Sequence, residues 1–105
     1  MVEGSKGIVV VQGDSYQKNL IVEDIDPITI DAIYISSRDL KISKQLVYDG
    51  DTHKYVFTLS PQETENLQSM STTFDITIYF ADGNVKTISY KARIEVLPKI
   101  NKVTR

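Results

Sequence analysis

The alternation of apolar and polar residues between Thr72 and Ala81 is the feature that most constrains how this chain can fold. A period of two is the pattern of a β-strand with one buried face. The side chains that it predicts to face inward are Phe74, Ile76, Ile78 and Phe80. Asp82-Gly83 follows directly and predicts a tight hairpin turn into a return strand that begins at Val85.

Short apolar segments separated by turn signals occupy most of the chain before this hairpin. Ile8–Val11 is a β-branched run too short for a helix, and after Gly13-Asp14 the pattern resumes over Tyr16–Glu23. We expect these two segments to form one bent or bulged first strand. A loop ends at Pro27, and Ile28–Ser37 is apolar on both faces, which predicts a central strand.

The middle of the chain predicts a second hairpin. Leu40–Lys44 is ambiguous, and Gln45–Tyr48 predicts a short strand that ends at the tight turn Asp49-Gly50. The segment His53–Leu59 runs back as the second strand of the hairpin, with Tyr55, Phe57 and Leu59 inward. At the C-terminal end the inward phase passes to Ala92, Ile94 and Val96, which predicts a bulge near 90–91 before Pro98 closes the last strand.

One helical turn interrupts the strands. Ser60 has the side chain of an N-cap, Pro61 suits the first helical position, and Glu63 lies three residues after the cap. A serine and a glutamate at this spacing form a capping box, in which each side chain accepts a backbone N–H of the other's position. The signal predicts a helix over about 61–67.

The order of these elements indicates an all-β protein. About seven or eight short strands with turns roughly ten residues apart, plus one helical turn, are typical of a β-sandwich. The 105 residues, 41% of them hydrophobic and 25% charged, suit one soluble domain. We expect the sandwich to span 8–97, with a flexible N-terminus at 1–7 and a basic tail at 98–105.

Charge and composition exclude several classes of function. A net charge of −2 provides no basic surface for nucleic acid. Cysteine is absent, so no disulfide or thiolate metal site can form. The N-terminus lacks the pattern of a signal peptide and no apolar run approaches the roughly 18 residues of a membrane span. We therefore expect a protein made in the cytoplasm without export.

No residue pattern predicts catalysis, a metal or a cofactor. His53 is the only histidine, and no motif places a nucleophile and a carboxylate around it, so an exposed residue beside a turn is the preferred interpretation. The acidic clusters Glu23–Asp26 and Asp49–Asp51 lack the spacing of a calcium loop, and turn chemistry explains both. We expect a protein that is not an enzyme. The six tyrosines could instead line a sugar-binding face, or simply be half-buried sheet residues.

Four short motifs carry a resemblance to a known family: Gln12–Ser15 before an apolar strand, the segment 55–67 with its capping box, Thr73–Ile76, and Asp82-Gly83. In this order they resemble the N-terminal domain of upper baseplate proteins and related tail or virion proteins from phages and prophages of Gram-positive bacteria. The likeness covers roughly 8–96. It implies an immunoglobulin-like antiparallel sandwich that lacks enzymatic activity, serves in virion assembly, and binds other phage structural proteins or copies of itself.

Two classes of function therefore remain open, a virion assembly module and a module that binds carbohydrate or a host surface. For assembly, the uncharged strand Ile8–Val11 would be an unprotected sheet edge, and the basic arm 99–105 could reach an acidic neighbour. The residues expected to make these contacts are Ile8, Val10, Lys99, Lys102 and Arg105. Those with a structural role in the turns are Ser60, Glu63, Asp82 and Gly83.

Overall fold

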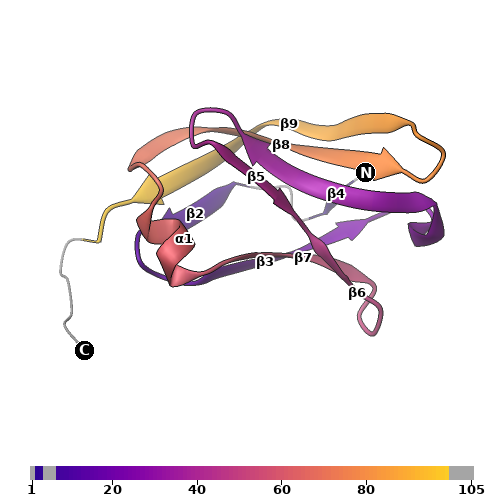
Figure 1. Ribbon diagram of the computed structural model, residues 1–105, viewed down its shortest axis with the longest axis horizontal. Coiled ribbons are helices and arrows are strands. Elements are labelled where there is room, and N and C mark those ends of the chain that lie inside the picture. Colours follow the sequence, from indigo (N-terminus) through magenta and orange to yellow (C-terminus); the bar gives the residue numbers. More distant parts are fainter. Residues whose placement is uncertain (1, 4–6, 100–105) are drawn as a thin grey trace.

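The strands pack as two sheets, face to face, in the computed structural model, which describes residues 2–3 and 7–99 (Figure 1). The four-stranded sheet has the order β1-β3-β7-β6, and the five-stranded sheet has the order β2-β9-β8-β4-β5. The strands are β1 (Val2–Glu3), β2 (Ile8–Val11), β3 (Tyr16–Val22), β4 (Ile30–Ser37), β5 (Ile42–Gln45), β6 (Val47–Asp49), β7 (Lys54–Leu59), β8 (Met70–Phe80) and β9 (Val85–Leu97). The predicted β-sandwich is confirmed.

The order of the strands is that of an immunoglobulin-like sandwich. The seven strands of that fold are labelled A to G in chain order. One sheet has the order A-B-E-D, and the other contains C, F and G and can carry an added edge strand. In this chain the sheet β1-β3-β7-β6 corresponds to A-B-E-D. In the other sheet β4, β8 and β9 correspond to C, F and G, and β5 is the added edge strand beside β4. One pair departs from the antiparallel prediction, because β2 lies parallel to β9.

The prediction of one bent first strand is wrong. β2 pairs with β9 in the five-stranded sheet, whereas β3 pairs with β7 in the four-stranded sheet. Between them the Asp14 N–H donates to the Val11 carbonyl at 3.0 Å, and Gly13 has a φ of +86°. This turn, with the left-handed conformation that glycine adopts readily, moves the chain from one sheet to the other.

The short strand predicted at Gln45–Tyr48 is also divided between the sheets. β5 ends at Gln45 and β6 begins at Val47, and the buried Leu46 lies between them. Its N–H donates to the Ile33 carbonyl at 2.8 Å, so pairing with β4 continues to the crossing point. The hairpin after β6 is present, but it is a four-residue connection over 50–53 rather than a tight two-residue turn.

The central strand β4 begins two residues later than predicted. Pro27–Thr29 forms a 3₁₀ turn, η1, whose N-cap is Asp26, and the Asp26 carboxylate accepts the Ile28 N–H at 3.1 Å. β4 therefore starts at Ile30, and it lies between β8 and β5 as a strand apolar on both faces suggests.

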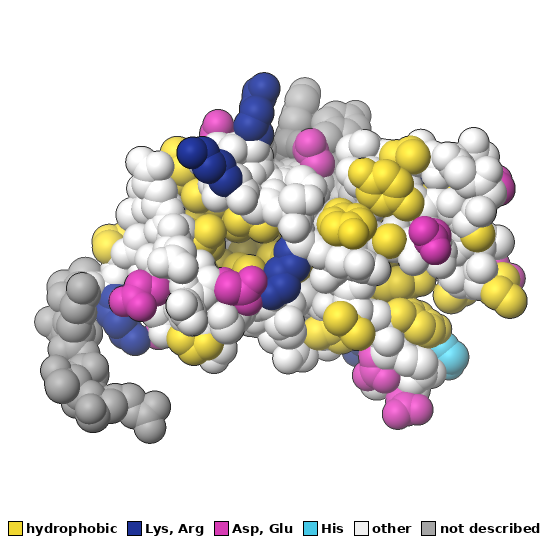
Figure 2. Space-filling view, in the orientation of Figure 1, with side chains coloured by type: hydrophobic (Ala, Val, Ile, Leu, Met, Phe, Trp, Pro, Cys, Tyr) yellow, Lys and Arg dark blue, Asp and Glu magenta, His cyan; other side chains and the backbone are white. Residues whose placement is uncertain are grey.

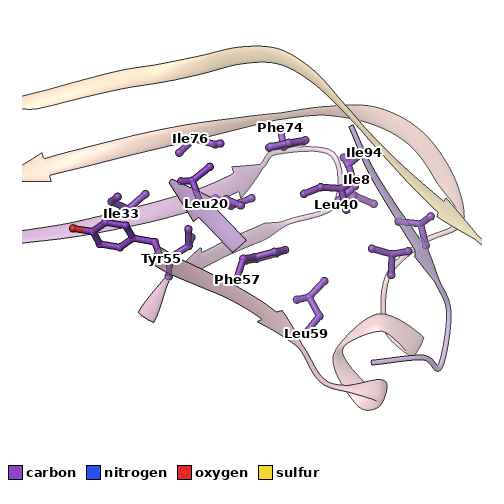
Figure 3. Close-up of a cluster of buried hydrophobic side chains, with 14 of the residues drawn as sticks. Ile8, Leu20, Ile33, Leu40, Tyr55, Phe57, Leu59, Phe74, Ile76 and Ile94 are labelled. Atoms are coloured by element: carbon purple, nitrogen blue, oxygen red, sulfur yellow. The ribbon is translucent and has the colours of Figure 1, made fainter. Parts of the chain in front are cut away.

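The predicted phase of β8 is confirmed. Phe74, Ile76 and Ile78 are buried and Phe80 is half-buried, while Thr77 lies on the other face, half-buried against its strand neighbours. Figure 3 shows side chains from both sheets meeting in this core. Buried residues of the core include Ile8, Leu20, Ile33, Ile35, Leu40, Tyr55, Phe57, Leu59, Phe74, Ile76, Ile78, Ile94 and Val96.

The long β8–β9 hairpin also follows its sequence signals. The Asp82 carboxylate accepts the Asn84 N–H at 2.9 Å, and Gly83 has a φ of +94°. Further along, the register changes between Phe74↔Ala92 and Ile76↔Ser89, which places a bulge where the change of inward phase predicted one. β9 ends at Leu97, directly before Pro98.

Candidate interaction surfaces

The helix α1 (Pro61–Glu65) is fastened at its start by the predicted capping box. The Glu63 N–H donates to Ser60 Oγ at 3.1 Å, and the Ser60 N–H donates to Glu63 Oε1 at 2.9 Å. The helix ends at Glu65 rather than at the predicted Leu67, because the last helical hydrogen bond runs from the Asn66 N–H to the Gln62 carbonyl. The structural roles predicted for Ser60 and Glu63 are thus present in the geometry.

Glu63 has a second partner, on β5. Lys44 Nζ lies 2.7 and 2.8 Å from the two carboxylate oxygens of Glu63. These bonds, together with the Ser60 N–H, hold the pKa of Glu63 below its ordinary value. One glutamate therefore closes the helix start and links it to the edge of the five-stranded sheet.

Thr64 joins the same helix to the turn after β2. Its side chain is fully buried, and Oγ1 accepts the Gly13 N–H at 3.0 Å. The hydroxyl lies 2.8 Å from the Asp14 carbonyl and 3.0 Å from the Pro61 carbonyl, to which it can donate. Gln12 adds a bond from Nε2 to the Leu67 carbonyl at 2.7 Å. Sequence reasoning missed Thr64, because two of the three partners of its hydroxyl, Gly13 and Asp14, lie about fifty positions away along the chain.

The strand β2 forms one edge of the five-stranded sheet. The Gln12 N–H donates to the Leu97 carbonyl at 2.9 Å, so by alternation Ile8 and Val10 also direct their backbone groups toward β9. Val9 and Val11 direct theirs away from it. Within the described residues no strand pairs with this outer side, so β2 is an open edge.

Ile8 and Val10 of β2 were predicted to contact a partner, but their side chains face the core. Both are core residues, each 1% exposed, and neither can contact a partner through its side chain. Val9 is 54% exposed, and it is the residue of β2 that a partner would meet. The contact prediction is therefore corrected from Ile8 and Val10 to the backbone and side chain of Val9.

The basic arm is described only at its first residue. Lys99 Nζ lies 2.7 Å from Asp14 Oδ1, which ties the chain after β9 to the turn after β2. Lys99 is thus occupied within its own chain. The predicted contacts of Lys102 and Arg105 lie outside the described residues.

The strand β5 forms the opposite edge of the same sheet. Since Leu46 bonds to Ile33, alternation turns the backbone groups of Ser43 and Gln45 away from β4. Beside this edge lies a hollow of about 420 Å³, and Figure 2 shows it as an apolar floor between α1 and β5, bordered by basic and acidic side chains. Its lining includes Ile42, Leu59 and Leu67 as apolar residues and Lys41, Lys44, Glu63 and Asn66 as polar ones.

Two tyrosines meet on the outer face of the five-stranded sheet. The rings of Tyr34 and Tyr79 are edge-to-face, with centroids 5.7 Å apart, and hydrophobic side chains gather over β4 there (Figure 2). A shallow hollow of about 390 Å³ beside them is also lined by Asp31, Ala32 and Ser43. Aromatic faces and polar side chains therefore converge at one place on this sheet.

The candidate metal and catalytic residues lie apart. His53 is exposed and its Nδ1 lies 3.1 Å from the Tyr48 hydroxyl, while Asp49 caps its own hairpin by accepting the Asp51 N–H at 3.0 Å. This bond and that of the Thr52 hydroxyl hold the pKa of Asp49 below its usual range. Across 2–3 and 7–99, no three His, Asp or Glu side chains gather in a group that could hold a metal ion.

In the part of the chain that the structure describes, no helix has the length and apolar character needed to cross a membrane. By sequence, the chain matches no protein-family profile and no curated protein.

Proposed function

We propose that this domain is a non-enzymatic assembly module of a phage or prophage virion, and that it joins a neighbouring subunit by adding a strand to β2. The observation that carries the proposal is the open edge of β2, an uncharged β-branched strand with Val9 exposed. The resemblance of the sequence to virion proteins supplies the biological setting. The immunoglobulin-like fold is compatible with this function but does not imply it.

The chemistry of β2 favours pairing. Soluble sheets protect their edges with lysine, proline, bulges or a covering loop, because unpaired N–H and C=O groups form a template for another strand. Ile8–Val11 contains no charge and no proline. Adding a strand would satisfy the outward N–H and C=O groups of Val9 and the outward N–H of Val11, whose carbonyl already accepts the Asp14 N–H, and it would cover the exposed Val9 side chain.

The strand is a fixed template rather than a loose segment. Ile8 and Val10 are buried in the core, and Thr64 and Lys99 hold the turn that follows. A partner would therefore meet an ordered edge, and it would not have to order the edge as it binds, which is one of the costs of association.

Sedimentation equilibrium over a range of protein concentrations tests the proposal. The wild-type chain is expected to show a species larger than one chain at high concentration, and Val9→Lys is expected to remove it, because the charge would lie on the pairing edge. Ile28→Lys is the matched control, since Ile28 is 83% exposed but lies in the 3₁₀ turn, outside every strand. A strictly monomeric wild type that also binds no virion protein encoded beside it would refute the assembly function.

The arm after β9 provides a second test of assembly. Deleting 100–105 while keeping Lys99 preserves the ion pair with Asp14 and removes the basic residues Lys102 and Arg105. If arm exchange contributes to association, the deletion weakens it, and more so at low ionic strength, where charge pairs are less screened. If β2 alone is responsible, the deletion variant associates as the wild type does.

Carbohydrate binding is a second candidate function, favoured by the Tyr34–Tyr79 hollow. An aromatic ring offers a flat apolar surface to a sugar ring, and Asp31 and Ser43 place oxygen atoms beside it for hydroxyl groups. Binding of purified cell-wall polysaccharide by wild type, lost in Tyr34→Ala and Tyr79→Ala but retained in Tyr48→Ala, would support this function. Tyr48 is a suitable control because it is exposed on a different strand, β6.

A further inference from the structure

We propose that the β5 edge and the hollow beside it form a binding site for an extended acidic peptide segment with one apolar anchor residue, supplied by a partner protein. The site is separate from β2, at the opposite edge of the five-stranded sheet. It combines an open backbone edge, an apolar hollow and a local excess of positive charge. These three properties specify the same kind of ligand.

The backbone of β5 provides the first part of the site. Ser43 and Gln45 direct their N–H and C=O groups away from β4, and no strand pairs with them within the described residues. An extended peptide laid along β5 can bond to these groups as an added strand. Successive side chains of such a peptide point to opposite faces, so one of them is directed toward the space between the sheets.

The hollow provides the second part. Ile42 and Leu67 are half-buried, and with the buried Leu59 they form an apolar floor between β5 and α1. Its volume of about 420 Å³ suits one large apolar side chain and part of a neighbouring one. The inward side chain of a peptide on β5 would therefore leave water for this floor.

Charge provides the third part. Two lysines, Lys41 and Lys44, border the hollow, and only one carboxylate, that of Glu63, lies with them. Lys44 is paired with Glu63, whereas Lys41 is exposed and has no ion-pair partner among the described residues. Carboxylates that flank the anchor of the peptide would pair with Lys41, and a basic segment would be repelled there. The basic arm of a second copy of this chain is therefore the wrong ligand.

A titration of the ¹⁵N-labelled domain with three synthetic peptides tests this site. The peptides are capped seven-residue threonine-rich strands that carry Asp-Leu-Asp, Lys-Leu-Lys or Asp-Ser-Asp at the centre. The expected result is amide shift changes at Ser43, Gln45 and Leu67 with the Asp-Leu-Asp peptide, and at least a tenfold weaker response to the other two. Lys41→Glu should weaken binding of the acidic peptide at least fivefold and improve binding of the basic one.

Two further variants separate the site from general charge effects and from β2. Lys86→Glu makes the same charge change at an exposed position of β9 and should leave the titration unchanged. Val9→Lys should also leave it unchanged, because β2 lies at the other edge. Equal binding of the acidic and basic peptides, binding that survives Lys41→Glu at full strength, or no shift at β5 at millimolar peptide would each overturn the proposal. The melting temperature of each variant establishes that it is folded.

Discussion

The two edges of the five-stranded sheet differ in what they offer a partner. β2 presents the exposed Val9 and no charge, while Ile8 and Val10 are buried in the core and Val11 is half-buried. β5 presents two open backbone positions beside Lys44, which is held by Glu63, and beside the exposed Lys41. Charged side chains on an edge strand prevent indiscriminate pairing, whereas an uncharged edge invites it. This difference is the basis of the two proposals, in which β2 pairs with a neighbouring subunit and β5 selects an acidic peptide segment.

The helix α1 connects these two edges through consecutive residues. Glu63 bonds to Lys44 on β5, and the next residue, Thr64, bonds to the turn that follows β2. A five-residue helix thus lies at the end of the sandwich where both edge strands are fastened. Variants in β2, in α1 and in the Lys44–Glu63 ion pair can therefore show how much each attachment contributes to the free energy of unfolding.

The largest expected effect is in β2 and tests whether that edge belongs to the core. Ile8→Ala should reduce the free energy of unfolding by about 2 to 5 kcal/mol, because it leaves a cavity at a fully buried position. Val9→Ala, one residue away, should change it by less than about 0.5 kcal/mol. Urea unfolding measures both. Equal losses for the two variants would contradict the assigned faces of β2.

The next effect concerns the attachment of α1 to the turn after β2. Thr64→Val keeps the shape of the side chain but leaves the Gly13 N–H without its acceptor, so a loss of about 1 to 3 kcal/mol is expected. Thr58→Val is the control, since Thr58 is exposed on β7 and also β-branched. Guanidinium unfolding of both variants compares them, and a Thr64→Val variant as stable as the control would exclude a stabilising role for the bridge.

A smaller effect is expected at the start of the helix. Ser60→Ala removes the acceptor of the Glu63 N–H and should cost about 1 kcal/mol. Gln62→Ala should be nearly silent, because the Gln62 side chain is exposed and only its backbone carbonyl is used. Thermal unfolding of the two proteins separates them, and identical midpoints would disprove the contribution of the cap.

The smallest effect is the pH dependence of the attachment to β5. Because the pKa of folded Glu63 lies below its ordinary value, its ionised form adds stability above the unfolded pKa of about 4.3, and this contribution is lost as the pH falls through the lowered pKa. Glutamine can still complete a capping box. Glu63→Gln should therefore show a shallower loss of stability than wild type between about pH 5 and pH 3, and parallel curves would contradict a linked charge.

Local chemistry explains which elements could be predicted from the sequence. The strand β8 alternates strictly, and Ser60, Pro61 and Glu63 satisfy or dispense with backbone groups within four residues, so neither depends on distant partners. β2 is different. A run of isoleucine and valine has no polar residue to mark its outer face, so its two buried side chains could not be distinguished from the exposed Val9.

The candidate interaction surfaces were harder to predict, because they depend on contacts between residues far apart in the sequence. The crossing of the chain at Leu46, the burial of Thr64 and the ion pair of Lys99 with Asp14 all join segments far apart in sequence. Nothing in the sequence around Thr64 indicates whether this threonine is buried and bonded to another segment or is exposed on the helix. The hollow beside β5 has no motif either, because its lining comes from the β4–β5 hairpin, β7, α1 and the segment after it.

Amide hydrogen exchange, measured residue by residue at low and high protein concentration, tests most directly the claim that β2 is the edge used for assembly. At low concentration Val9 and Val11 should exchange fast and Val10 slowly, because only the Val10 N–H faces β9. At high concentration Val9 and Val11 should become protected, while Ser43 and Gln45 on β5 stay fast. Val9 and Val11 amides that exchange equally fast at every concentration, or protection that appears at β5 instead, would contradict the account.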